Sequence, residues 1–136
     1  MDIHMENILD HWRNPRNSGI MKDADIIFSD SNPLCGDEIK MQLKVKNNNI
    51  KEVKFLGRGC SISQAAADLL SDYVKDKNLN DIKNIKNEEM IKMLGIEIGP
   101  VRIKCALLGL FALKKGIYLK EGIKMEDSNL NGQITN

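Results

Sequence analysis

The chain of 136 residues is 42% hydrophobic, which is enough for one compact core and too little for two independent domains. Its 20 lysines and arginines nearly balance 19 aspartates and glutamates, so the overall charge favours neither nucleic acid nor a membrane as a partner. The longest apolar run, Cys105 to Leu113, falls far below the ~18 residues of a membrane span. The chain shows no signal or transit sequence, which predicts a cytoplasmic protein whose three cysteines are reduced thiols or metal ligands.

The N-terminal third contains two predicted elements. Residues 3–12 place their apolar side chains on one helical face, and Asn14-Pro15 ends the pattern, which predicts a short helix. The apolar residues 26–28 precede the break at Asn32-Pro33 and predict a strand.

The clearest strand pattern follows in residues 38–46. Apolar and polar side chains alternate there, as in a strand with one solvated face. Residues 47–49 are three asparagines that predict a turn, and residues 50–56 predict a second strand. The two strands should form an antiparallel hairpin and, with residues 26–28, a three-stranded sheet.

A change of period marks the start of the helical part of the chain. Apolar residues recur at helical spacing over residues 62–74, and Ser61 with Gln64 predicts a capping box at the start of this helix. Cys60 would then lie just outside the first turn. Residues 75–85 predict a polar connection.

Two further helices are predicted before the C-terminus. Residues 88–94 predict a short helix that ends at Gly95. Pro100 opens a longer helix over residues 101–115, with Gly116 as its stop. This helix is apolar on two sides, which predicts a central position in the fold.

These elements predict an α+β fold, namely a small three-stranded antiparallel sheet with helices packed on one face. Residues 1–125 should form one domain. Residues 126–136 are polar and predict a disordered tail.

Each cysteine lies at the boundary of a predicted element. Cys35 lies in the loop before the hairpin, Cys60 at the start of a helix, and Cys105 one turn into the last helix. A lone cysteine is commonly a small core residue, but three such positions together indicate a site. No Cys-x-x-Cys pair is present, so the fold would have to assemble any shared site.

Asp37 lies two residues after Cys35 and adds a candidate carboxylate ligand. Three thiolates and one carboxylate supply the four ligands that tetrahedral zinc or a [2Fe-2S] cluster requires. The alternative role for Asp37 is the capping of a turn.

Several neighbours of the cysteines are candidate supporting residues. Gly36 and Gly59 let backbone approach a metal site closely, or serve turn geometry alone. Arg102 lies three residues before Cys105, where its charge would favour a thiolate unless it is merely solvated. Both Cys60 and Cys105 lie near a helix N-terminus, which also favours the thiolate.

The two histidines are not connected to an acid or a thiol by any sequence motif. His4 and His11 are therefore predicted to be surface residues and not ligands. The chain contains no glycine-rich phosphate loop and no Ser-His-Asp or His-x-x-x-His pattern, which argues against a conventional hydrolase or nucleotide enzyme.

Four segments become recognisable when they are taken together and in order. They are Asp10-His11-Trp12-Arg13-Asn14-Pro15-Arg16-Asn17, Cys35-Gly36-Asp37, Gly57-Arg58-Gly59-Cys60-Ser61-Ile62-Ser63 and Arg102-Ile103-Lys104-Cys105. These segments resemble the U-type iron-sulfur cluster assembly scaffolds, a family that includes IscU, SufU and the N-terminal domain of NifU. The resemblance runs from about Ile8 to Ile117.

The resemblance implies a scaffold and not an enzyme. Cys35, Asp37, Cys60 and Cys105 would hold a transient [2Fe-2S] cluster, built from iron and from sulfur supplied by a cysteine desulfurase, and passed to apo-proteins. A zinc-bound resting form is also implied. A carboxylate oxygen holds an iron-sulfide unit less firmly than a fourth thiolate would, which favours release. Either Cys35 or Cys105 would accept the persulfide, and the sequence does not choose between them.

The chain departs from the IscU pattern at two places. Lys104 replaces the histidine that IscU-like members carry before the third cysteine, which is closer to SufU, although the segment between Asp72 and Pro100 is short for the SufU insertion. Residues 99–102 replace the Leu-Pro-Pro-Val-Lys motif, which argues against release assisted by an Hsp70-type chaperone.

Two alternatives to the scaffold remain open from the sequence. The first is a zinc-binding sulfur acceptor that activates a cysteine desulfurase, a sulfurtransferase-like role. The second is a binding module whose cysteines are structural.

Overall fold

The sheet has three antiparallel strands in the order β1-β2-β3. The computed structural model describes residues 3–33 and 36–122, so the predicted tail at 126–136 lies outside the described residues. The strands are β1 (Ile26–Asn32), β2 (Asp37–Lys46) and β3 (Asn49–Arg58). Met41 lies opposite Phe28 on one side and Phe55 on the other, so these side chains share the face that the helices cover. The predicted sheet is confirmed.

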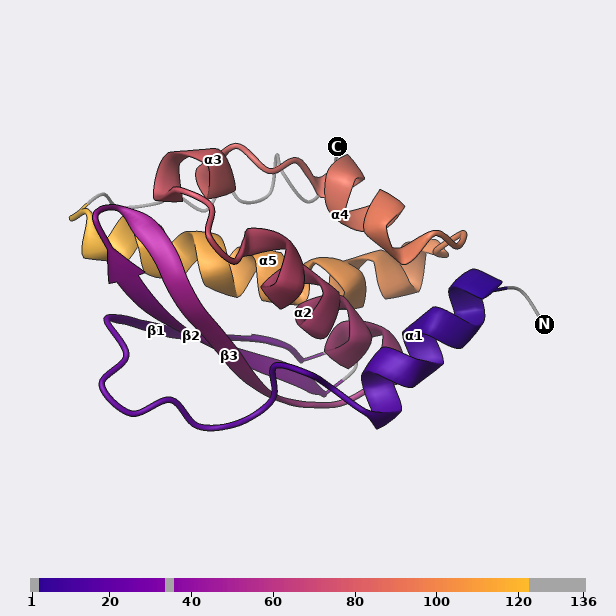
Figure 1. The fold of residues 1–136 in the computed structure, drawn as a ribbon. Helices are drawn as coiled ribbons and strands as arrows, with labels where there is room; N and C mark the ends of the chain where they lie inside the picture. The colour runs from indigo at the N-terminus through magenta and orange to yellow at the C-terminus, as the bar shows by residue number, and fades with distance from the viewer. Residues whose placement is uncertain (1–2, 34–35, 123–136) are drawn as a thin grey trace.

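Five helices complete the described fold: α1 (Ile3–Arg13), α2 (Ser61–Val74), α3 (Leu79–Lys83), α4 (Asn87–Leu94) and α5 (Pro100–Lys120). Figure 1 shows α2 and α5 lying across one face of the sheet, with α3 and α4 on their outer side and α1 against one end of α2. This arrangement confirms the predicted α+β fold. None of the described helices combines the length and the apolar character that a membrane crossing needs.

Helix α5 is longer than the sequence predicts, because Gly116 does not end it. The helix continues to Lys120. A Cβ atom at Gly116 would lie 2.8 Å from Ile26 Cγ2 and 3.2 Å from Phe28 Cβ. The glycine therefore serves the close approach of α5 to β1 and not a helix stop. The predicted central position of this helix agrees with the burial of nearly all its residues from Cys105 to Ile117.

The N-terminal helix buries a different set of side chains from the predicted one. Ile8 and His11 are buried, whereas Ile3 and Trp12 are exposed. The prediction that His11 is a surface residue is wrong: it is 8% exposed, and its Nδ1 donates to Asp68 Oδ2 across 2.5 Å. This contact with α2 could not be anticipated from a motif, because the two residues are far apart in sequence.

Three smaller expectations also differ from the structure. The predicted polar connection at residues 75–85 contains α3, whose first turn is capped by the Asn78 side chain accepting from Asn80 N at 2.7 Å. The predicted capping box at Ser61 is absent, because Cys60 is the N-cap of α2 and makes no side-chain cap bond. Gln42, predicted to be on the solvated face, is buried because it accepts from Met21 N and donates to Gly19 O.

Candidate metal centre

Three elements that are distant in sequence bring Asp37, Cys60 and Cys105 to one place. Asp37 is the first residue of β2, Cys60 directly precedes α2, and Cys105 lies in the second turn of α5. One ligand atom from each residue lies within 4.8 Å of the other two. Ligands that bind one zinc ion at about 2.0–2.3 Å are separated by about 4 Å or less, so small shifts would suffice for coordination. Two thiols and a carboxylate are donors that zinc and iron-sulfide units accept.

The pairing of β2 with β3 positions Cys60 beside Asp37. Glu38 pairs with Arg58, so the end of β3 lies next to the start of β2. Asp37 Oδ1 then accepts a hydrogen bond from Cys60 N at 2.8 Å, and Asp37 Oδ2 lies 3.6 Å from Cys60 Sγ. This backbone contact fixes the buried carboxylate, which is 1% exposed, with its second oxygen toward the sulfur.

Gly59 is required by the close approach of this carboxylate. Its φ is +125°, and a Cβ atom there would lie 1.9 Å from Asp37 Oδ1. By contrast, Gly36 has a φ of +72°, and no described residue lies within 4 Å of the position of its missing Cβ. Of the two predicted supporting glycines, Gly59 makes room for the site itself, whereas Gly36 serves backbone conformation.

The sulfur of Cys105 lies against the end of β1. Asn32 pairs with Asp37 across the sheet, and its Nδ2 donates to Cys105 Sγ at 3.8 Å. A donor to sulfur favours the thiolate over the thiol. The sequence predicts only a break of the strand at Asn32-Pro33, because no local pattern shows that Asn32 pairs with Asp37.

The two described cysteines lie at different distances from the start of a helix. Cys60 is the N-cap of α2. Cys105 lies in the second turn of α5. Arg102 lies in the first turn of α5 and is exposed, so its supporting role stays a prediction.

Cys35, the predicted fourth ligand and candidate persulfide acceptor, lies outside the described residues. The described neighbour on its C-terminal side is Gly36, whose N donates to Asn32 O at 2.9 Å. Asp37 follows directly. The roles assigned to Cys35 therefore remain predictions.

A second group of ligand-type atoms comes from His11, Asp68 and Asp72, again within 4.8 Å of one another. Asp68 is fully buried, and its Oδ1 accepts from Arg16 N at 3.0 Å and from Asn17 N at 2.9 Å. Its Oδ2 accepts from His11. N–H groups therefore surround this carboxylate where a cation would have to bind, so the group does not fit a metal.

Comparison with known proteins supplies the family. The NifU-like N terminal domain family matches residues 3–127. The zinc-dependent sulfurtransferase SufU of Bacillus subtilis is 34% identical over 137 residues, covering 88% of this chain and 92% of the relative. The iron-sulfur cluster assembly scaffold protein IscU of Haemophilus influenzae is 35% identical over 118 residues, covering 84% of this chain and 92% of the relative.

Solved structures share the fold. A putative iron-sulfur cluster assembly scaffold protein from Fervidobacterium islandicum superimposes with a TM-score of 0.69 at 24% identity, covering 85% of this chain and 99% of that one. The N-terminal part of a NifU-like protein from Brucella abortus gives a TM-score of 0.72 at 18% identity, covering 86% and 93%. The family match over residues 3–127, with the SufU and IscU relatives, shows that the chain belongs to the NifU-like N-terminal domain family.

Proposed function

We propose that this protein is a scaffold on which a labile [2Fe-2S] cluster is assembled and from which it is passed to apo-proteins. The observation that carries the proposal is the convergence of Asp37, Cys60 and Cys105 from three separate elements. The names of the IscU and SufU relatives support it. The cluster is cargo in this account, so the protein acts as a carrier and not as an enzyme.

The sulfur and oxygen ligands differ in how firmly they bind the cluster. Thiolates from Cys60 and Cys105 bind iron, and Cys35 completes the sulfur ligands. Asp37 supplies the harder oxygen ligand, which binds the iron-sulfide unit less firmly and makes release easier. The hydrogen bond from Cys60 N holds Asp37 in place before the cluster arrives.

Sulfur reaches the scaffold by thiol exchange with a cysteine desulfurase. An acceptor thiolate attacks the outer sulfur of the desulfurase persulfide, forms a new S–S bond and displaces the desulfurase cysteine as a thiolate. Cys105 is 1% exposed, so this attack requires its covering groups to move first.

A second candidate function is a zinc-dependent sulfur acceptor that activates the desulfurase. The observations that favour it are the SufU relative and Lys104 in place of a histidine ligand. Asp37, Cys60 and Cys105, with Cys35, would hold the zinc ion. Zinc would keep the thiols deprotonated and poised for exchange. Sulfur acceptance would then proceed without cluster assembly.

Anaerobic reconstitution with ferrous iron, cysteine, a cysteine desulfurase and a dithiol reductant, which reduces the persulfide sulfur to sulfide, tests the scaffold. The wild-type chain should develop cluster absorption with two irons and two sulfides per site. Cys60→Ala should develop none, while Ser61→Ala, the adjacent substitution that keeps every thiol, should match the wild type. Retention of a full cluster by Cys60→Ala would contradict the site.

The same preparations separate the alternatives. A zinc-loaded chain that raises desulfurase turnover but never gains cluster absorption would favour the sulfur acceptor. Cysteines that bind neither metal, and that react with a thiol reagent only after unfolding, would favour a binding module with structural cysteines.

A further inference from the structure

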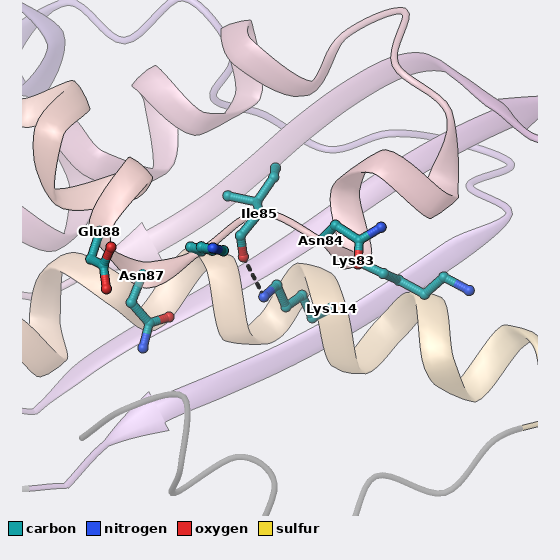
Figure 2. A pocket seen from close by; sticks show the side chains of 7 residues that line it. Lys83, Asn84, Ile85, Asn87, Glu88 and Lys114 are labelled. Atoms are coloured by element: carbon teal, nitrogen blue, oxygen red, sulfur yellow. Dashed lines mark hydrogen bonds between the residues drawn. The ribbon is translucent and has the colours of Figure 1, made fainter. Parts of the chain in front are cut away.

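A pocket lies on the segment that joins α3 to α4, away from Cys105 along α5. Its volume is about 660 Å³, within the range of about 300–1,000 Å³ that is typical of small-molecule sites. It is lined by Lys83, Asn84, Ile85, Lys86, Asn87, Glu88 and Lys114. Figure 2 shows Asn87 and Lys114 on the same side of the joining segment, with Lys114 contributed by α5.

The side-chain amide of Asn87 is buried without hydrogen-bond partners among the described residues. Asn87 is the first residue of α4 and is 8% exposed. Among the described residues, neither its Nδ2 nor its Oδ1 has a hydrogen-bond partner, although both atoms are buried. Buried amides in folded proteins are nearly always paired, because an unpaired one loses its hydration without replacement. A ligand that accepts a hydrogen bond from Nδ2 and donates one to Oδ1 would satisfy both atoms.

Lys114 adds a buried charge with spare hydrogen-bonding capacity. It is 2% exposed, and its Nζ donates to Ile85 O at 2.5 Å. An ammonium group has three donors, and within the described chain this carbonyl is the one hydrogen-bond acceptor assigned to it. Burial lowers the pKa of Lys114, and the nearby Glu89 carboxylate opposes that shift. An anion beside Nζ would stabilise the charged form.

The other charges of the pocket are mixed in sign. Three lysines and one glutamate, Glu88, line it, and the Glu89 carboxylate lies near Lys114. Lys83 Nζ is already paired with Glu121 Oε2 at 2.8 Å, so Lys86 and Lys114 supply most of the positive charge that a ligand would meet. The pocket also borders the first turn of α4, where Glu89 N already donates to Lys86 O at 3.0 Å.

We propose that this pocket binds a small molecule with an oxyanion group, a phosphate or a carboxylate, held by Lys114 Nζ and Asn87 Nδ2. Asn87 Oδ1 selects ligands that carry a hydroxyl or N–H donor beside that group. The pocket is separate from the metal centre, because Lys114 lies nine residues after Cys105 on one helix, or about 14 Å along its axis.

Titration of the full, isotopically labelled chain followed by NMR tests this binding. The probes are inorganic phosphate, acetate and glycolate, each added at constant ionic strength maintained with sodium chloride. We expect saturable shifts of the Asn87 side-chain amide and of the backbone amides at the start of α4. Glycolate should bind more tightly than acetate, since its hydroxyl can donate to Asn87 Oδ1. Phosphate-only saturation would identify a phosphate site, and glycolate-only saturation a carboxylate site.

Two variants and two matched controls decide whether the shifts report this pocket. Asn87→Asp keeps the side-chain size but adds a negative charge, and Lys114→Met removes the positive charge. Each should weaken binding at least tenfold. Asn7→Asp and Lys120→Met make the same charge changes at exposed positions and should leave binding unchanged. The folded state of each variant is checked from its amide spectrum.

The proposal is overturned if no probe gives saturable shifts, or if chloride alone reproduces them. It is equally overturned if Asn87→Asp, in a folded chain, binds as tightly as the wild type. Should Lys114→Met fail to fold, the isosteric Asn87→Asp and its control still decide the outcome. None of these results depends on whether a cluster can be assembled at the cysteines.

Discussion

Two groups of side chains place ligand-type atoms equally close together, yet their surroundings differ. At the metal centre, Asp37 Oδ1 takes one backbone hydrogen bond and Oδ2 faces the sulfur of Cys60. At the second group, backbone N–H groups of Arg16 and Asn17 bind one oxygen of Asp68, and His11 binds the other. The first carboxylate keeps an oxygen directed at a thiol, whereas the second is surrounded by donors.

This difference shows why proximity alone does not make a metal site. A cation needs lone pairs that point toward one centre, and N–H groups around a carboxylate exclude it from that position. The Asp68 group instead joins the segment after α1 to α2 and stabilises the fold. The candidate metal centre lies at the meeting point of β2, α2 and α5, where the fold brings Asp37, Cys60 and Cys105 together.

The largest expected effect separates the two groups by metal binding. Cys60→Ala and Cys105→Ala should each lower zinc affinity by more than about 100-fold, because each removes a thiolate from the donor set. His11→Ala should leave zinc affinity unchanged. Competition with a chromophoric chelator measures all three. Equal losses in His11→Ala and Cys60→Ala would remove the distinction between the groups.

The stability of the fold should depend strongly on Asp68, although the group that contains it is not expected to bind metal. Asp68→Ala leaves the Arg16 and Asn17 N–H groups and His11 without their acceptor, and should lower the free energy of unfolding by about 3–5 kcal/mol. Asp72→Ala should cost less than about 1 kcal/mol, since this exposed residue accepts one bond, from Asn17 Nδ2. Urea unfolding of the metal-free proteins compares them, and equal costs would show that burial of Asp68 is unimportant.

Substitution of Gly59 and of Gly36 should affect zinc affinity at the candidate metal centre to different extents. Gly59→Ala would place a Cβ against Asp37 Oδ1, so the carboxylate must move and zinc affinity should fall about tenfold. Gly36→Ala meets no described residue and should cost about 1 kcal/mol of stability through its positive φ, with a smaller change in affinity. The same chelator competition measures affinity, and urea unfolding measures stability. A larger affinity loss in Gly36→Ala would contradict the assigned role of Gly59.

The smallest expected effect concerns Lys114. This lysine is buried, and its Nζ donates a hydrogen bond to the carbonyl oxygen of Ile85. Its pKa is lowered in the folded state, so between the folded and unfolded pKa values the unfolded chain binds more protons and stability rises with pH. Lys114→Met removes the cost of burying the charge and should raise Tm at pH 7 by up to about 4 °C. That gain should shrink as pH rises toward 10.5, the ordinary lysine value. Thermal unfolding at several pH values checks both, and a gain independent of pH would contradict the cause.

Much of the fold follows from the sequence because its signals are local. Alternation in residues 38–46 and the asparagine turn after them predict the hairpin. Apolar spacing in residues 62–74 predicts α2. The errors arise where distant residues decide the outcome: Gly116 is a contact with β1 and not a stop, and His11 is buried because of Asp68.

The candidate site was predictable as a list of residues but not as a geometry. Cysteine positions and the resemblance named Asp37, Cys60 and Cys105 together. The register of β1 against β2, which brings Asn32 opposite Asp37 and toward Cys105, depends on tertiary packing that no local pattern carries. The same holds for Asn87 and Lys114, which belong to separate helices and share a pocket through the packing of α4 on α5.

X-ray absorption at the zinc edge of the zinc-loaded chain tests the central claim most directly. The account predicts a shell of three sulfurs at about 2.3 Å with one oxygen at about 2.0–2.2 Å, and a sulfur shell smaller by one in Cys60→Ala. A nitrogen and oxygen shell with imidazole scattering, unchanged in Cys60→Ala and abolished in His11→Ala, would contradict the account.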